Sequence, residues 1–253
     1  MVLFLLALAT LSAGAEEMLW SLDRYPLDTE EMGRAFRRKN DEQGLVPVGI
    51  ESDGKTMTVL SLHNSRLGAR SWRMSSYDDF ELFKKALTDG INEGFTPIDL
   101  SYNGNRLFVL FLALEAVPEG WAWVVCPPSA AEIKKVIDPW VEQGYQPTGI
   151  TMIDGTFGTL LVRFKNRSLR GWTLTADSDV DSLTGQIRQR LARGELPCGL
   201  LTGTKATNIV FLSWADEAGS ASTSITPDPD EQEPMTLKQI EAFIFESYVQ
   251  QSP

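Results

Sequence analysis

The residues of this sequence that could do chemistry are carboxylates rather than histidines or cysteines. His63 is the sole histidine and Cys126 and Cys198 are the two cysteines, so zinc sites and Ser-His pairs lack their usual side chains. A glycosidase, in contrast, needs two carboxyl groups about 5–10 Å apart. Asp99 and Glu115 are the candidate pair: Asp99 stands where three similar segments have glycine, and Glu115 follows the partner strand of the same hairpin. The alternative is that both residues lie on a solvated strand or loop edge.

Seven tryptophans offer a second kind of site. Most fall at or near one position of a repeating pattern, which favours packing in the core. Trp121 and Trp123 share one face of a strand, whereas Ala122 takes the repeat register, so this pair could turn outward. Exposed aromatic side chains on a concave surface suit protein or glycan binding, with core packing as the alternative. The possible ligand-binding residues are therefore Trp121, Trp123, Asp99 and Glu115.

Composition and charge exclude several functions. The chain has 253 residues, 43% of them hydrophobic and 23% charged, which is ordinary for a globular protein. Its formal net charge is −11 and its pI is near 4.7, whereas binding to a phosphate backbone needs clustered lysine and arginine. The P-loop, Gly-x-Gly-x-x-Gly and Gly-x-Ser-x-Gly motifs are missing. We therefore expect no nucleic-acid partner and no cofactor, whether a metal or an organic group.

The N-terminal segment is typical of an export signal. Residues 2–15 form a predominantly apolar run that is too short to span a bilayer, and Ala13-Gly14-Ala15 supplies a small-x-small cleavage pattern. The basic residues that usually precede such a run are missing, and a buried N-terminal helix or strand is the alternative. We expect residues 1–15 to be a signal peptide, a secreted or periplasmic location, and no membrane span. Whether Cys126 and Cys198 form a disulfide in that compartment is left open.

Four glycines recur along the chain with a period of fifty residues: Gly44, Gly94, Gly144 and Gly194. Each is followed three residues later by proline. A strict period of this length indicates an internal repeat. Each glycine follows a helical pattern and precedes a strand pattern. The repeat units span about 17–66, 67–116, 117–166 and 167–216, with a terminal strand and helix over 217–253. Residues 16–253 then form a single repeat domain.

Within each unit the pattern predicts a strand, a helix and a hairpin. Apolar residues at i, i+3, i+7 and i+11 place one face of each helix in the core, for example Phe83, Leu87 and Ile91. Asp28, Asp78, Ser129 and Asp179 are the candidate N-caps. Asp53-Gly54, Asn103-Gly104 and Asp154-Gly155 are predicted to be type I′ hairpin turns.

These elements predict an α+β fold of tandem β-α-β-β repeats of about 50 residues, stacked into a curved, half-barrel-like array. Because one unit cannot bury its own apolar face, neighbouring units must share a core. An open array would use the first and last elements as caps, and a closed ring would bring the C-terminal elements beside the first unit. We favour the open array.

The segment from Ile137 to Ile150, IDPWVEQGYQPTGI, resembles the bacterial tandem repeat domain. The module is also similar to the N-terminal repeats of fungal secreted polyglycine hydrolases, in which a helix, a glycine–aromatic step, a strand, a turn and an aromatic-rich strand follow one another. The pattern covers nearly all of residues 17–250, and the fourth unit departs from it with Glu195 in place of the aromatic residue. The resemblance implies a secreted, curved scaffold. In polyglycine hydrolases the activity belongs to a separate domain resembling serine β-lactamases, so we do not expect it here.

Two functions follow from the sequence. The first is a secreted or periplasmic repeat scaffold that binds a protein, a peptide or a cell-envelope polymer such as a glycan. The alternative is a hydrolase that uses acidic residues on a glycan or peptide substrate. The extended surface of a repeat array favours the first.

Overall fold

The computed structural model describes residues 20–202 and 206–214. In these residues the order strand, helix, strand, strand occurs four times, and we number the four segments units 1 to 4. The predicted signal peptide, residues 1–15, and the predicted terminal strand and helix, residues 217–253, lie outside the described residues.

The elements of each unit are as follows. Unit 1 contains β1 (Trp20–Pro26), α1 (Thr29–Gln43), β2 (Leu45–Ser52) and β3 (Thr56–His63), followed by a short 3₁₀ turn (Asn64–Arg66). Unit 2 contains β4 (Ser71–Tyr77), α2 (Phe80–Asn92), β5 (Thr96–Tyr102) and β6 (Leu107–Ala113). Unit 3 contains β7 (Pro118–Cys126), α3 (Ala130–Glu142), β8 (Tyr145–Ile153) and β9 (Thr156–Phe164). Unit 4 contains β10 (Leu169–Asp177), α4 (Val180–Ala192), β11 (Leu196–Thr202) and β12 (Thr207–Trp214).

Each unit forms its own antiparallel sheet of three strands, so the fold is mixed α+β and mostly β. The last strand of the unit lies in the middle, giving the orders β1-β3-β2, β4-β6-β5, β7-β9-β8 and β10-β12-β11. The strand after each helix is therefore an edge strand of its sheet. Proline can occupy such a strand because an edge strand does not need every backbone N–H for pairing.

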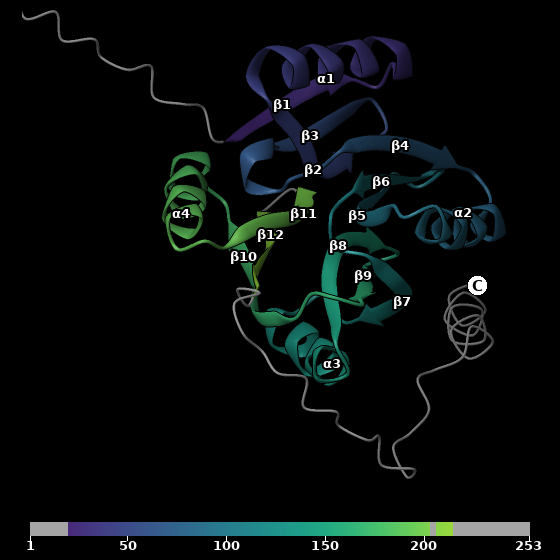
Figure 1. The fold of residues 1–253 in the computed structure, drawn as a ribbon, viewed down its shortest axis with the longest axis vertical. Helices are drawn as coiled ribbons and strands as arrows, with labels where there is room; N and C mark the ends of the chain where they lie inside the picture. Colours follow the sequence, from purple (N-terminus) through teal and green to yellow (C-terminus); the bar gives the residue numbers. More distant parts are fainter. Residues whose placement is uncertain (1–19, 203–205, 215–253) are drawn as a thin grey trace, which may run out of the picture.

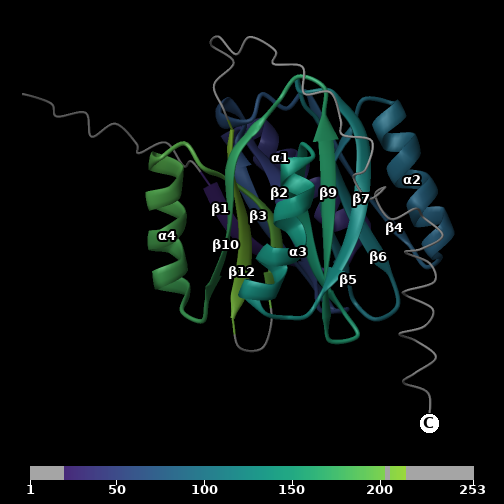
Figure 2. The ribbon, with the colours of Figure 1, turned by 90° about the horizontal axis from the view of Figure 1, so that it is seen from below.

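The four edge strands that follow the helices, β2, β5, β8 and β11, meet along a central axis. Figure 1 looks roughly down this axis, with these strands near the middle and the four helices spaced around the outside. Figure 2 shows the strands running roughly along the axis. Each of the four inner strands packs against its two neighbours, and β11 of unit 4 also packs against β2 of unit 1.

The contact between β11 and β2 corrects the open, half-barrel-like array that we favoured from the sequence. The inner strands form a closed set of four, because the described part of unit 4 returns to unit 1. Closure gives every inner strand neighbours on both sides, so its exposed backbone edge is covered by the next unit. A sheet edge left open to solvent would be a site for unwanted pairing.

The helices bury the predicted apolar face. On α2, α3 and α4 the two middle residues of that face are at most 2% exposed, and Ile91 at the end of α2 is half-buried; the middle residues are Phe83, Leu87, Ile133, Ile137, Leu183 and Ile187. Each helix ends before a glycine of positive φ, and for Gly44 this angle is 65°. Glycine takes this left-handed conformation without the steric penalty of a Cβ atom, which explains the fifty-residue spacing of these glycines. None of the helices in the described part of the chain is long and apolar enough to cross a membrane.

The hairpin turns differ from one another. The turn at Asp154-Gly155 has two residues, both with positive φ (48° and 78°), as a type I′ turn requires. The turns that begin at Asp53 and Asn103 are longer, so the type I′ prediction is wrong for them. There the side-chain oxygen of Asp53 or Asn103 accepts hydrogen bonds from the backbone N–H groups two and three residues later. These Asx-type hydrogen bonds stabilise the turn in place of a second residue with a positive φ angle.

The N-caps are as predicted at Asp28 and Asp179, whose side chains accept backbone hydrogen bonds from the first turn of α1 and α4. At α2 the prediction is wrong by one residue: Asp79, not Asp78, is the cap, and its Oδ1 accepts from the Leu82 N–H at 2.8 Å. Ser129 is the N-cap position of α3, but its side chain makes no capping hydrogen bond.

The neighbouring aspartates give a test of this assignment. Asp79→Ala is expected to lower the free energy of unfolding by about 1 kcal/mol, the ordinary cost of losing an N-cap. For a chain of this size the melting temperature should fall by about 2–4 °C. Asp78→Ala is the matched control and should leave thermal melts followed by circular dichroism unchanged. Equal losses in the two variants would contradict the assignment of the cap.

Candidate functional site

Asp99 lies on the central axis, surrounded by the other three units. It is on β5 and is 0% exposed. In each inner strand the pairing slips by one residue next to this position, between Pro97 and Asp99 in unit 2. Such a β-bulge bends the strand and redirects its side chains. The bulges therefore turn this position of all four strands toward the axis.

The Asp99 carboxyl group accepts one backbone hydrogen bond from each of the other units. Its Oδ2 accepts from the Ile50 N–H at 2.7 Å and from the Leu200 N–H at 2.9 Å. Its Oδ1 accepts from the Ile150 N–H at 3.3 Å. One side chain thus satisfies a buried backbone donor in unit 1, unit 3 and unit 4, and joins the four units at one point.

The glycines equivalent to Asp99 allow the strands to come this close. A Cβ atom on Gly149 would lie 3.0 Å from the Asp99 Cα atom, and one on Gly199 would lie 3.2 Å from the Gly149 Cα atom. A Cβ atom on Gly49 would lie 2.9 Å from the Leu200 Cβ atom. The axis therefore has room for one side chain at this level, and the sequence places the aspartate there.

Two residues further along the strands, a second group of polar side chains joins neighbouring units. The Ser101 hydroxyl accepts from the Ser52 N–H at 2.8 Å, and the Thr151 hydroxyl accepts from the Tyr102 N–H at 3.0 Å. Glu51 holds the equivalent position in unit 1 and is 8% exposed. We call Asp99, Glu51, Ser101 and Thr151 the axial polar group. All four are buried.

Burial dominates the electrostatics of this group. Complete burial raises the pKa of Asp99 well above its ordinary value, and the N–H groups of Ile50 and Leu200 that donate to it oppose the rise. Burial raises the pKa of Glu51 to about 8, and the Ser101 hydroxyl opposes this rise. Burial also raises the pKa of the Cys198 thiol, with a further contribution from the Asp99 charge.

The structure does not bring Asp99 and Glu115 together. Asp99 pairs with Leu110 on β6, and Glu115 lies five residues beyond Leu110, exposed in the loop that leads to β7. Five extended residues cover roughly 16 Å, which exceeds the separation of a glycosidase carboxyl pair. Asp99 is also enclosed, with its oxygens occupied by backbone donors. The two residues therefore do not form the carboxylate pair considered from the sequence.

The two tryptophans are used inside the fold rather than turned outward as a pair. Trp123 is 3% exposed and packs over Gly158, where an added Cβ atom would lie 2.1 Å from the ring. Trp121 is half-buried, and its Nε1–H donates to the Thr88 hydroxyl on α2 at 3.2 Å. The outward-turned pair is therefore wrong, and packing between units takes its place.

Strand pairing explains the error. Trp20, Trp72, Trp121 and Trp172 pair with four residues spaced fifty apart, Leu62, Leu112, Val162 and Leu212. Trp121, not Ala122, is thus the equivalent of the other tryptophans. The rings in units 2 to 4 contact the helix of the preceding unit: Trp72 contacts Phe36 edge to face, and the Trp172 Nε1–H donates to Asp138 at 3.0 Å. Loops of slightly different length shift the numbering while the pairing stays constant.

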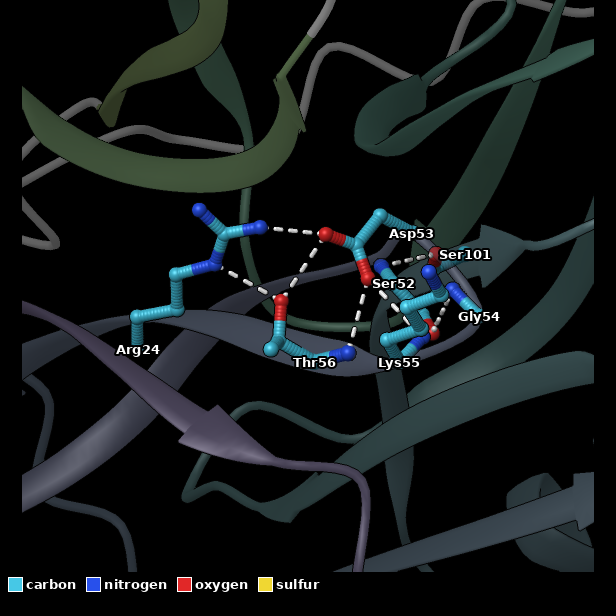
Figure 3. A network of polar contacts seen from close by, with 7 residues as sticks. All are labelled: Arg24, Ser52, Asp53, Gly54, Lys55, Thr56 and Ser101. Atoms are coloured by element: carbon cyan, nitrogen blue, oxygen red, sulfur yellow. Dashed lines mark hydrogen bonds and ion pairs between the residues drawn. The ribbon is translucent and has the colours of Figure 1, made fainter.

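One motif of the sequence, at residues 52–55, forms a hairpin turn. Ser52-Asp53-Gly54-Lys55 has the Ser-x-x-Lys spacing found in serine β-lactamases, but it forms a hairpin turn (Figure 3). Ser52 is buried and its Oγ accepts from the Gly54 N–H at 3.2 Å, whereas Lys55 is exposed. The Asp53 carboxylate in the same turn pairs with Arg24. Hydrogen bonds from the Thr56 and Lys55 N–H groups lower the pKa of Asp53 and stabilise the hairpin turn.

His63 has a hydroxyl neighbour that the sequence did not indicate, since its Nδ1 lies 2.7 Å from the Ser65 Oγ. The same nitrogen accepts from the Ser65 backbone N–H at 3.3 Å, which makes His63 the N-cap of the 3₁₀ turn after β3. Cys126 and Cys198 are both free and buried, so the disulfide that the sequence left open is not formed. Across the residues that the structure describes, no three His, Cys, Asp or Glu side chains cluster as metal ligands.

The best-organised candidate site is thus the axial polar group, and its geometry links units together. Searches against protein-family models and curated proteins gave no match to this chain.

Proposed function

We propose that this chain is a secreted or periplasmic scaffold that binds a protein, a peptide or a cell-envelope polymer. The observation that carries the proposal is the state of Asp99. The carboxyl group that the sequence singled out for catalysis is fully buried and accepts backbone hydrogen bonds from three other units. A hydrolase would need such a group at the surface, within hydrogen-bond reach of a substrate.

The arrangement of the strands supplies surfaces for binding. The inner strands β2 and β5 run in the same direction, because Ile50 meets Asp99 and Ser52 meets Ser101 two residues further along both strands. The contacts of Ile150 with Asp99 and of Thr151 with Tyr102 give the same direction for β5 and β8. The hairpin turns then lie at one end of the ring, and the loops that connect the units lie at the other. Loops held on a rigid framework are the usual place for binding residues. The resemblance of residues 137–150 to secreted repeat scaffolds supports the same function.

We place the binding surface at the end that carries the connecting loops. Val117 is 46% exposed there and Glu115 beside it is also exposed. The loop is held by a hydrogen bond from the Val117 N–H to the Asn166 side chain at 3.0 Å, which ties it to the next connecting loop. An exposed apolar side chain on a fixed loop suits contact with a partner. The acidic charge of the chain favours a basic or neutral partner over nucleic acid.

The test measures binding and turnover in one experiment. The full chain is exposed to peptide and envelope-glycan arrays, and hits are measured by calorimetry while mass spectrometry follows the ligand. We expect binding without turnover, and Val117→Asp should weaken it at least tenfold. Leu82→Asp is the matched control, since Leu82 is 55% exposed on the outer helix α2. Both variants should melt like the parent chain.

Two outcomes would count against the scaffold. Turnover that scales with protein and disappears in Glu115→Gln would support the acidic hydrolase instead. Binding that is equally strong in both Asp variants would contradict the loop-end surface. Peptide hits and glycan hits distinguish a protein partner from an envelope polymer.

A further inference from the structure

Glu51 is a buried acid whose carboxyl group lacks part of its hydrogen bonding. It lies on β2 and is 8% exposed, and its Oε2 has no hydrogen-bond partner among the described residues. A buried carboxylate without donors is costly, because burial removes the water that solvates its charge. Such an oxygen therefore needs either a proton or a bound cation.

The residues on either side of Glu51 join units 1 and 2. The Ile50 N–H donates to Asp99 of β5 at 2.7 Å, and the Ser52 N–H donates to the Ser101 hydroxyl of β5 at 2.8 Å. Glu51 stands between these two hydrogen bonds and itself interacts with Ser101. Figure 3 shows the Ser52–Ser101 bond beside the hairpin turn of unit 1. Any movement of Glu51 out of the interior must disturb this contact.

The charged group that acts on Glu51 disfavours its ionised form: the charge of Asp53, in the turn after β2, raises the pKa of Glu51 further. The charge of Glu51 in turn raises the pKa of Asp99 on β5. Cys198 of β11 lies against Asp99 and is buried. The strands β2, β5, β6 and β11 contain no basic side chain. Arg24 is held by Asp53 at the surface of the turn.

A proton satisfies this site better than a cation does. Cations such as calcium take six or more oxygen ligands, several of them carboxylates. Here the Asp99 oxygens are already occupied by backbone donors, and the described residues contain no cluster of three acidic or other metal-ligating side chains. A neutral carboxyl group needs no such ligand set.

We propose that Glu51 is a pH-sensitive lock on the contact between units 1 and 2. When neutral it stays buried between β2 and β5, and when ionised it leaves the interior and opens the hydrogen bonds that flank it. This device goes beyond the proposed binding function and does not depend on it.

The direction of the pH effect follows from the raised pKa of Glu51, about 8 against an ordinary 4.5. Below pH 4.5 the group is protonated in both the folded and the unfolded chain, and its contribution to stability is fully present. As the pH rises toward 8 the unfolded chain loses the proton first, so the contribution is lost through this window. The equilibrium constant for unfolding should rise about a thousandfold from this group alone.

The experiment compares the full chain with Glu51→Gln between pH 4.5 and 9. Glutamine keeps the shape of the neutral acid and cannot ionise. In chemical denaturation we expect the variant to match the parent at pH 4.5 and to become progressively more stable than it as the pH rises. Glu115→Gln, at an exposed carboxylate, should follow the parent throughout. Parallel curves for parent and Glu51→Gln would overturn the proposal.

Two further measurements separate the lock from other causes. Hydrogen exchange, corrected for the intrinsic effect of pH, should lose protection at residues 50–52 of the parent above pH 8, and keep it in Glu51→Gln. Loss of protection spread equally over β9 and β12 would contradict a local opening. Titration with sodium, potassium and calcium at pH 9 should leave the parent unchanged, and saturable recovery of stability would show a cation site instead.

Discussion

Asp99→Ala is expected to be the most damaging single substitution at the axis, lowering the free energy of unfolding by about 3 kcal/mol. The change removes the acceptor for the backbone N–H groups of Ile50, Ile150 and Leu200, which are buried in three different units. Each unsatisfied buried donor costs about 1–3 kcal/mol. Removing a fully buried carboxyl group returns part of this loss, because its own burial is unfavourable.

The comparison among variants identifies the cause. Asp99→Gly gives unit 2 the residue that the other three units have at this position, so any loss belongs to the carboxyl group and not to an unsuitable backbone. Asp99→Asn keeps one oxygen but aims an N–H₂ group at a backbone donor, and should fall between the parent and Asp99→Ala. Asp89→Ala, on the surface of α2, is the control. The measurement is urea denaturation at pH 7, and an Asp99→Ala midpoint equal to that of the parent would disprove the role of this residue as the joint of the ring.

The sequence predicts the units of this fold well because each depends on local chemistry. Gly44 and its equivalents mark the helix ends through their positive φ angles, and the apolar spacing of Phe83 and Leu87 marks the buried helix face. These features need only neighbours along the chain. The order of strands and helices follows directly from them.

Closure of the ring could not be predicted in the same way. It depends on contacts between residues about 150 positions apart, such as Gly49 with Leu200. Asp99 carried a signal that can now be understood: one acid among three glycines at equivalent positions. The pattern suggested a reactive carboxylate, whereas the structure shows that only one side chain fits where four strands meet. The prediction for Trp121 was wrong for another reason. Spacing in the sequence assigned Ala122 to the repeat position, whereas strand pairing shows that Trp121 occupies it.

Asp99 and Glu51 have different roles at the axis, because their carboxyl groups are hydrogen-bonded to different extents. Asp99 accepts backbone donors from three units, so its role is to hold. Glu51 has an oxygen without a partner, so its role changes with its proton. The axial polar group thus combines an acid whose oxygens are held by backbone donors with an acid that has one oxygen without a partner.

The second large effect is expected at Gly199, where backbone conformation and crowding act together. Gly199 has a φ of 72°, which residues with a Cβ atom adopt at a cost of about 1–2 kcal/mol. An added Cβ atom would also lie 3.1 Å from the Thr148 carbonyl oxygen and 3.2 Å from the Gly149 Cα atom. These are backbone atoms of unit 3, which cannot rotate away as a side chain could. Overpacking of this kind adds about 1–3 kcal/mol.

Gly194 separates the two contributions. It has a φ of 77°, but an added Cβ atom there meets nothing within 4 Å. Gly194→Ala should therefore lose only about 1–2 kcal/mol, the cost of the backbone angle. Gly199→Ala should lose roughly 2–5 kcal/mol, since it adds the clash to the same angle. Gly171→Ala, at ordinary φ and in open space, should melt with the parent.

Thermal and urea unfolding of these three variants therefore measure how tightly the axis is packed. If Gly199→Ala lost no more than Gly194→Ala, the strands could separate at the axis without cost, and β8 and β11 would not be held together there. A larger loss that is confined to Gly199→Ala would show that unit 4 is packed into the ring through its backbone. That result tests the contact between β8 and β11, because the atoms that would crowd the added methyl group belong to β8.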